Sequence, residues 1–235
     1  NTMPAVRFFR IFSPHSFLDK YIEREFMKAG YTLMPDVSST DQCIAVFIAG
    51  DHTTPLLPCA AGEKLMVIVQ PDTEIPQWLD TVPHHTIIRT PYVIGTGMTG
   101  LMRDIVAMVG RGTMFHLAGN EARVSVIHAI DVARLTVALC DCSGDFSITD
   151  GCDPTWRELI EALSVRVGHK RIATVSPRVA HWLCRIGRIW GGPDEKMMQK
   201  MSATETIVAT QLPVEFMPVN VTNHLKTHIY TDEDL

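Results

Sequence analysis

Three residues near the N-terminus have the spacing of a phosphate-binding turn, although none of them is glycine. The pattern of residues 6–30 predicts a strand, a tight turn and an amphipathic helix, and Ser13, Ser16 and Asp19 fall where a dinucleotide-binding turn has G-x-x-G-x-x-G. Each of those glycines lets backbone approach phosphate, or helix approach strand, without a Cβ in the way. Asp19 would place a carboxylate at the positive end of the helix dipole, where it repels a second anion. With Ser16 as N-cap, this helix start needs no phosphate.

An acidic residue further along could bind a ribose. In dinucleotide-binding folds an Asp or Glu about twenty residues after the glycine turn commonly contacts the ribose hydroxyls. Asp36 lies close to that position, in the polar loop 35–41. An aspartate that only forms a turn after Pro35 is the alternative interpretation.

The elements that would position these residues are buried strands in the first hundred residues. Continuous apolar runs at 43–49, 64–70 and 85–94 are typical of strands buried on both faces, hence of a parallel sheet. Several connections are only about a dozen residues long, near the minimum for a helical crossover. The sheet is therefore expected to be a reduced one, with some connections that lack a full helix.

The second half of the chain alternates further helices and strands. Strands are expected over 123–128 and 144–149, and helices over 101–110, 131–140, 155–167 and 177–190. Thr155 and Glu158 form the signature of a capping box. We predict an α/β fold: a reduced Rossmann-like parallel sheet flanked by helices in residues 1–100, and a smaller C-terminal α/β lobe with a closing tail in residues 101–235.

Composition excludes several classes of function. The chain has 235 residues, 46% of them hydrophobic, and a net charge of −5, which gives no reason to expect nucleic-acid binding. We expect no transmembrane segment, because no apolar run approaches about 18 residues. The N-terminus lacks a secretory pattern, so a cytoplasmic location is expected. The six cysteines show no zinc-ligand spacing, and the adjacent His84 and His85 would point to opposite faces of a strand, so we expect no metal site.

Three stretches together resemble a known enzyme family. Residues 87–97, 123–139 and 146–163 are similar, in order and spacing, to R-P-x-x-V-Y-G-P-G, F-V-H-V-x-D-x-A and Y-N-[IV]-x-D-G-x-x-x-T-W-x-E-L. These motifs are typical of the extended short-chain dehydrogenase/reductase family, the NAD-dependent epimerase/dehydratases. The tail 217–230 is similar to the family's closing helix. The resemblance implies NAD(P) as cofactor.

The resemblance also assigns family positions to individual residues. Cofactor-binding positions fall on the turn and the loop discussed above: Ser13, Ser16, Phe17, Leu18 and Asp36. The family's nucleotide-sugar substrates are commonly bound through a diphosphate-binding arginine, and Arg123 lies one residue from that position. Because a one-residue shift on a strand turns the side chain to the other face, this assignment stays open. His128 and Asp131 match positions that mainly orient a strand-to-helix turn.

The family's catalytic residues have no counterpart. Members use a Tyr-x-x-x-Lys dyad and a Ser or Thr at a strand end, with the tyrosine as acid/base and the lysine lowering its pKa. Residues 70–89 contain neither tyrosine nor lysine. The catalytic residues are therefore unknown, and the remaining candidates for a replacement acid or base are Thr73, His84 and Tyr92.

The expected helix 177–190 carries basic and apolar residues together. Basic residues stand at Arg178, His181, Arg185 and Arg188, and an apolar stripe runs through Val179, Trp182, Ile186 and Ile189. Such a pattern suits a partner interface, an anionic ligand or a membrane surface. A plain solvated face is the alternative.

Both parts of the enzyme's machinery are missing, the phosphate cradle and the acid/base pair. We therefore predict a degenerate family member, catalytically inactive, that serves as a binding or scaffold protein, with a homodimer or another protein as partner. The alternative is an active NAD(P)-dependent sugar-nucleotide epimerase, dehydratase or reductase that uses replacement residues. A third hypothesis is a protein that binds a nucleotide sugar without NAD(P).

Overall fold

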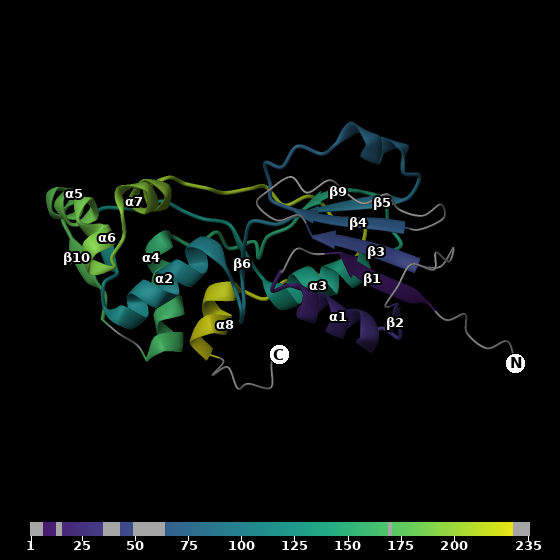
Figure 1. Ribbon diagram of the computed structural model, residues 1–235, viewed down its shortest axis with the longest axis horizontal. Coiled ribbons are helices and arrows are strands. Elements are labelled where there is room, and N and C mark those ends of the chain that lie inside the picture. Colours follow the sequence, from purple (N-terminus) through teal and green to yellow (C-terminus); the bar gives the residue numbers. More distant parts are fainter. Residues whose placement is uncertain (1–6, 13–15, 35–42, 49–63, 169–170, 228–235) are drawn as a thin grey trace, which may run out of the picture. The chain divides into compact units, whose positions relative to one another are not determined.

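A six-stranded parallel sheet forms one part of the molecule (Figure 1). The computed structural model describes residues 7–12, 16–34, 43–48, 64–168 and 171–227. The strand order is β2-β1-β3-β4-β5-β9, so the direction of winding reverses between β1 and β3. The strands are β1 (Phe8–Phe12), β2 (Thr32–Leu33), β3 (Cys43–Ile48), β4 (Lys64–Val69), β5 (His85–Arg89) and β9 (Gly144–Ser147). The predicted α/β fold with a parallel sheet is confirmed.

The two faces of this sheet are covered differently. Helices α1 (Asp19–Lys28) and α3 (Ala129–Ala138) pack on one face, where Phe9 of β1 stacks on Phe26 of α1 at a ring-centroid distance of 4.9 Å. The other face is covered by the segment 71–83, whose 3₁₀ helix η1 (Gln77–Thr81) buries Leu79 completely. In Figure 1 this segment arches over β4 and β5. The β4–β5 connection therefore lacks a full helix, as predicted.

Several element boundaries differ from the sequence prediction. Helix α1 begins at Asp19, with Leu18 as the N-cap residue, rather than directly after Ser16. The strand expected over 123–128 is confined to β8 (Val126–His128), which pairs with β6 (Tyr92–Ile94), while Arg123 forms only an isolated bridge with Thr155. The buried residues of β8 continue directly into α3, whose first turn is capped by His128.

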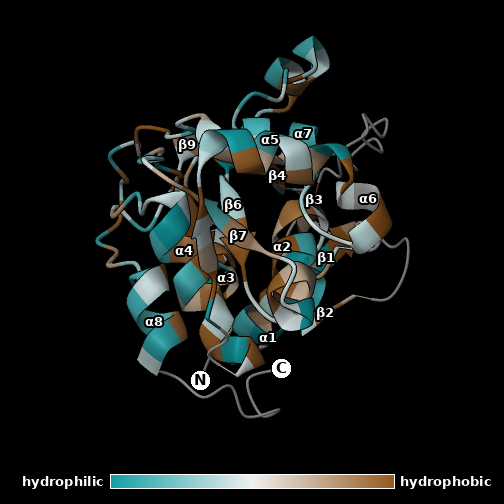
Figure 2. Ribbon diagram, turned by 90° about the vertical axis from the view of Figure 1, so that its left-hand side faces the viewer, coloured by the Kyte–Doolittle hydropathy of each residue, from teal (hydrophilic) through white to brown (hydrophobic). Residues whose placement is uncertain are grey.

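Helices dominate the rest of the molecule. They are α2 (Gly100–Arg111), α4 (Trp156–Ser164), η2 (Val165–Val167), α5 (Pro177–Arg185), α6 (Gly187–Trp190), α7 (Glu195–Ser202) and α8 (Val221–Thr227). Two short strands, β7 (Phe115–Leu117) and β10 (Ala173–Val175), pair in parallel. Helix α4 alternates between brown and teal in Figure 2, and its apolar side buries Trp156, Leu159 and Leu163. The predicted capping box is present: the Thr155 hydroxyl accepts from the Glu158 N–H, and the Glu158 carboxylate accepts from the Thr155 N–H.

The helix expected over 177–190 is broken in two. Helix α5 ends at Arg185, and α6 begins at Gly187 after a non-helical Ile186. Gly187 packs so closely on the backbone of Pro193 that a Cβ placed there would collide with the Pro193 carbonyl oxygen. The chain turns back on itself here, which a continuous helix would prevent.

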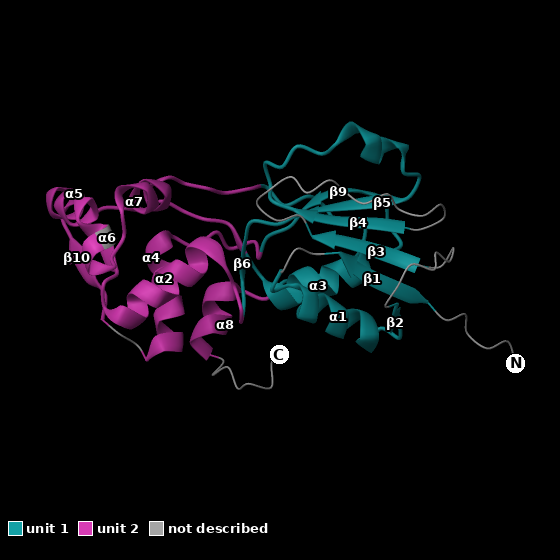
Figure 3. Ribbon diagram, in the orientation of Figure 1, with its two compact units in different colours: residues 1–95, 127–149, 208–218 teal, residues 96–126, 150–207, 219–235 magenta. Residues whose placement is uncertain are grey.

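The chain divides into two compact units, each assembled from three segments (Figure 3). Unit 1, which contains the sheet, comprises residues 1–95, 127–149 and 208–218; unit 2 comprises residues 96–126, 150–207 and 219–235. From the sequence we predict one boundary near residue 100. The difference arises because β9 returns to the sheet and pairs with β5.

Candidate functional site

The junction of β1 and α1 is the place where a dinucleotide-binding fold holds a pyrophosphate. Here the Leu18 N–H donates to the Ser16 hydroxyl oxygen at 3.1 Å, and Asp19 places a carboxylate in the first turn of α1. Phe17 and Leu18 pack into the core beneath the helices. Ser13 and Asp36, the other predicted cofactor-binding positions, lie outside the described residues. In the described part of this junction, the Ser16 hydroxyl occupies the Leu18 N–H, and the Asp19 carboxylate lies beside the other N–H groups at the start of α1. These described residues do not fit a pyrophosphate.

One arginine links the carboxyl end of β5 to the segment after β4 and to Asp145 within β9. Arg89, the last residue of β5, donates from Nε to Asp145 Oδ1 at 2.9 Å and from Nη2 to Asp145 Oδ2 at 3.0 Å. Its Nη1 donates to the backbone carbonyls of Pro71, at 2.8 Å, and Thr73, at 2.9 Å. Charged, bidentate pairs of this kind are among the stronger hydrogen bonds in proteins. Arg89 therefore ties the segment after β4 to β9.

The structure does not bring the three catalytic candidates together. Thr73 follows β4 and accepts from Arg89 through its backbone carbonyl, and Tyr92 begins β6, beyond the end of β5. His84 precedes β5, and its carbonyl accepts from the N–H of Leu65 near the start of β4. Because β4 and β5 are parallel, His84 lies at the amino edge of the sheet, whereas Thr73 and Tyr92 follow its carboxyl edge. An acid/base pair of His84 with either of the other two is excluded by this topology.

Arg123 lies in unit 2, where its guanidinium already has a protein partner. The Nη1 atom donates to the backbone carbonyl of Asp153 at 2.9 Å, and the side chain is exposed. The Asp153 carboxylate accepts from the Ser125 hydroxyl at 2.6 Å. These contacts connect Arg123 and Ser125 to the loop before α4. A diphosphate would have to displace the Asp153 carbonyl to use Arg123 fully.

His128 and Asp131 serve the start of α3. His128 is 1% exposed and its Nδ1 accepts from the N–H of Ile130, which caps the helix. Asp131 is completely buried and pairs with Arg134 at 2.9 Å. His128 therefore caps the helix at the strand-to-helix turn, and Asp131 holds Arg134 within the same helix.

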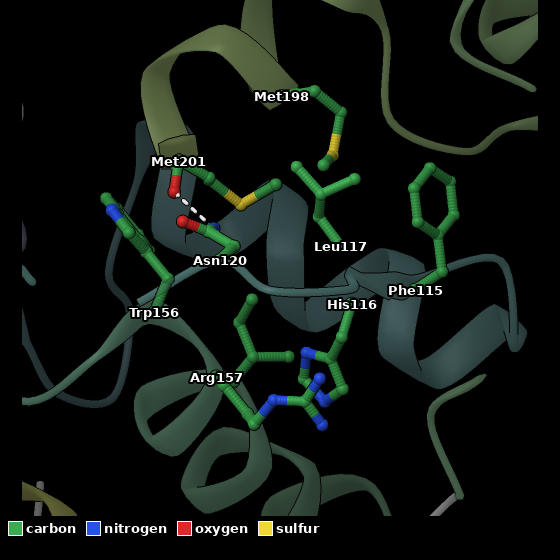
Figure 4. Close-up of a pocket in the computed structure, with 9 residues that line it drawn as sticks. Phe115, His116, Leu117, Asn120, Trp156, Arg157, Met198 and Met201 are labelled. Carbon is green, nitrogen blue, oxygen red and sulfur yellow. Dashed lines mark hydrogen bonds between the residues drawn. The ribbon is translucent and has the colours of Figure 1, made fainter. Parts of the chain in front are cut away.

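A small pocket in unit 2 contains a buried histidine that the sequence analysis does not identify (Figure 4). The pocket has a volume of about 10 Å³, room for about one water molecule. His116, on β7, is 5% exposed, and its Nε2 has no hydrogen-bond partner among the described residues; the nearest carboxylate oxygen, on Glu161, is 3.5 Å away. Burial lowers the pKa of His116 to about 4, and the positive charge of Arg157 acts in the same direction. The imidazole is therefore neutral near pH 7.

A larger hollow of about 350 Å³ lies between α5 and α7. Its lining is mainly apolar and includes Leu117, Ala180, Cys184 and Met198. Within the described part of the chain, no group of three or more His, Cys, Asp or Glu residues could hold a metal ion. Nor does any described helix combine the length and the apolar character that crossing a bilayer requires.

Comparison with known proteins identifies the fold. No protein-family model matches the sequence, and no curated protein matches it. Among solved structures, the human epimerase family protein SDR39U1 with NADPH has a TM-score of 0.57 at 11% identity, covering 93% of this chain and 98% of that one.

Two bacterial structures agree. RMD from Pseudomonas aeruginosa, complexed with NADPH, has a TM-score of 0.55 at 13% identity and covers 94% of this chain and 95% of that one. UDP-N-acetylglucosamine 4-epimerase from Bacillus cereus has a TM-score of 0.51 at 10% identity and covers 83% of this chain and 98% of that one. The chain therefore has the extended short-chain dehydrogenase/reductase fold, an α/β Rossmann-like fold shared with NAD(P)-dependent epimerases and reductases.

Proposed function

We propose that this protein retains the extended short-chain dehydrogenase/reductase fold as a catalytically inactive binding or scaffold protein. The observation that carries the proposal is the Arg89 network, which links the carboxyl end of β5 to the segment after β4 and to Asp145 within β9. In open α/β sheets, ligands bind outside the carboxyl ends of the strands. Here Arg89, at the end of β5, forms an ion pair with Asp145 of β9 and donates to the carbonyls of Pro71 and Thr73 after β4, so its guanidinium and these two carbonyls are used for internal contacts.

The chemistry required for the family's reaction also lacks its residues. A general acid/base must reach the substrate within hydrogen-bond distance, and its pKa must be tuned by its neighbours. The segment 71–83 offers the Thr73 hydroxyl but no tyrosine or lysine. Tyr92 stands on another strand, and it does not begin a Tyr-x-x-x-Lys motif, because the residue four positions later is Thr96.

The β1–α1 junction supports the same proposal. An NAD(P) pyrophosphate requires close backbone approach and free N–H donors at a helix start. The hydroxyl of Ser16 accepts from the N–H of Leu18, and Asp19 adds a negative charge to the first helical turn. We expect this carboxylate to repel the two negative charges of the pyrophosphate and so to weaken NAD(P) binding.

A second candidate function is an NAD(P)-dependent sugar-nucleotide epimerase, dehydratase or reductase with replacement residues. The observation in its favour is that two structures of the same fold contain NADPH. In this alternative, Thr73 and Tyr92 are the residues available for acid/base chemistry, because both follow the carboxyl edge of the sheet.

Titration of the purified protein with NAD⁺, NADH, NADP⁺ and NADPH, followed by melting temperature and calorimetric heat, distinguishes the two functions. A ligand at a hundred times its dissociation constant adds about 2.7 kcal/mol of apparent stability. We expect no shift and no heat with any of the four. Micromolar binding by the wild-type protein would overturn the proposal.

Asp19→Asn is the informative variant for this titration. It removes the negative charge from the first turn of α1 and retains an amide of similar size. If the wild-type protein binds NADPH at this junction, Asp19→Asn should bind it more tightly. A wild-type affinity that Asp19→Asn leaves unchanged would place the nucleotide elsewhere.

A further inference from the structure

The outer surface of α5 and α6 exposes large apolar side chains. Val179 is 47% exposed, Trp182 63% and Ile189 88%. Val179 and Trp182 are three residues apart on α5, so they are neighbours on the helix surface. In Figure 2 helix α5 carries both brown and teal residues. Exposed apolar groups gathered in this way commonly mark an interaction site.

These side chains are not needed to hold α5 in place. The opposite side of the helix contributes Ala180 and Cys184, which are each 5% exposed. Both line the hollow between α5 and α7. Helix α5 is therefore attached to unit 2 through its inner side. Trp182 lies on the outer side and, being 63% exposed, contributes little to that packing.

The same segment is strongly basic within an acidic protein. Residues 162–193 contain no Asp or Glu, whereas the whole chain has a net charge of −5. The basic residues of this segment are Arg166, Lys170, Arg171, Arg178, Arg185 and Arg188. Arg178 and Arg185 are exposed on α5, and within the described part of the chain neither forms an ion pair or a hydrogen bond through its side chain. Their charges are thus available to an external anion.

We propose that Arg178, Val179, Trp182, Arg185 and Ile189, the basic–aromatic face, bind an anionic lipid surface. Arginine beside tryptophan and aliphatic residues is the pattern of helices that lie in the membrane interface. Helix α5 has 9 residues, which gives a length of about 14 Å, so it fits an orientation along the interface and cannot span the bilayer. The positive charge complements an anionic leaflet.

A lipid surface suits this face better than an acidic protein does. The apolar side chains are highly exposed and are distributed over two short helices rather than lining a groove for a partner's anchor residue. A specific protein interface usually buries about 800 Å² on each side and centres on a well-packed core. A bilayer interface instead accepts individually exposed tryptophan and isoleucine side chains without a matching shape.

Co-sedimentation of the full chain with vesicles tests the proposal. The vesicles are pure phosphatidylcholine in one arm and phosphatidylcholine with about 30 mol% phosphatidylserine in the other. We expect binding to the anionic vesicles, weakening as salt is raised, and much weaker binding to the neutral ones. Since each basic residue near an anionic surface contributes about fivefold, Arg178→Ala with Arg185→Ala should reduce binding by about 25-fold.

Matched controls separate this face from net charge. Arg24→Ala with Arg103→Ala removes the same charge from exposed positions on α1 and α2 and should leave vesicle binding within about twofold. Trp182→Ala should weaken binding by about tenfold, whereas Trp78→Ala, at a partly exposed position on η1, should not.

Fluorescence quenching by acyl-chain-brominated lipid adds a direct readout. Quenching should be present in the wild-type protein and largely lost in Trp182→Phe, because Trp182 is the indole expected to enter the interface. The proposal is overturned if the protein stays in the supernatant with anionic vesicles, if neutral vesicles bind it equally, or if the control variants lose binding as the face variants do. Circular dichroism of each variant checks that it is folded.

Discussion

Arg89 in unit 1 and His116 in unit 2 differ in how their polar groups are satisfied. In unit 1, Arg89 has a carboxylate and two backbone carbonyls as partners. In unit 2, the Nε2 atom of His116 is buried without a hydrogen bond among the described residues, and Arg178 and Arg185 are exposed without an ion pair there. A polar group with internal partners stabilises the fold and is not available to a ligand. A polar group without internal partners costs stability when it is buried, and it is available to bind a ligand when it is exposed.

The largest expected effect is a loss of stability in acid that arises from His116 in unit 2. His116 has a folded pKa of about 4, below its unfolded value of about 6.5. Between these values the unfolded chain binds more protons, so the stability that neutral His116 contributes above pH 6.5 is lost as pH falls toward 4. From pH 7 to 4.5 we expect unit 2 to lose about 2 to 3 kcal/mol through this group.

Urea denaturation at the two pH values, followed by tryptophan fluorescence, measures this loss. His116→Gln should remove most of that pH dependence, while His84→Gln, which removes an exposed imidazole from unit 1, should retain it. Equal pH dependence in wild-type and His116→Gln proteins would show that the buried imidazole does not distinguish the units.

Removing the Arg89 side chain should give the next largest effect. Arg89→Leu leaves the carbonyls of Pro71 and Thr73 and the carboxylate of Asp145 without their donor. Because the Asp145 side chain is 44% exposed, solvent screens part of the loss, and we expect destabilisation by about 2 kcal/mol in urea denaturation. Arg103→Leu, at a pair with the neighbouring Asp104, should cost less than about 0.5 kcal/mol. Similar losses in both variants would contradict the role given to the network.

A capping variant tests whether unit 2 also contains well-satisfied polar groups. Thr155→Ala removes the hydroxyl that accepts from the Glu158 N–H at the start of α4. The expected cost is about 1 kcal/mol in the free energy of unfolding. The hydrogen bonds from Thr155 lower the pKa of Glu158, so the cost should shrink in acid as that carboxylate is protonated. A cost that persists unchanged at low pH would mean that the hydrogen bond from the Thr155 hydroxyl to the Glu158 carboxylate adds little, and that the hydroxyl stabilises the helix by accepting from the Glu158 N–H.

The smallest effect on stability is expected at the exposed arginines. Arg178→Ala with Arg185→Ala removes two charges without internal partners, so the free energy of unfolding should change by less than about 0.5 kcal/mol. This is the opposite of the result expected for Arg89→Leu. A large destabilisation by the double variant would show that these side chains support unit 2 rather than a ligand.

The sequence predicted the elements better than the contacts between them. The apolar runs at 43–49 and 64–70 correspond to β3 and β4, because a buried strand requires a local pattern of side chains. The Thr155 capping box was likewise predictable, since both partners lie within one helical turn. The Arg89–Asp145 pair joins residues 56 positions apart, and no local pattern reports such a contact.

Two further differences have the same physical origin. His116 stands between Phe115 and Leu117 in a short strand, and nothing in that sequence distinguishes a buried, unpartnered imidazole from a solvated one. The break at Ile186 occurs next to the close approach of Gly187 to Pro193, a contact that only the folded chain reveals. A Gly-Gly-Pro sequence at 191–193 signals a turn, but not where the preceding helix stops.

The interleaving of the two units constrains how the protein is made. Strand β9 is synthesised after α2 and β7, so the sheet of unit 1 cannot be completed while a ribosome is still translating unit 2's first segment. Until then Arg89 lacks Asp145, and the edge of β5 that β9 will cover is unpaired. An open strand edge on a nascent chain is a template for aggregation. Chaperone dependence during translation is therefore expected to be concentrated in the interval between the emergence of β5 and that of β9.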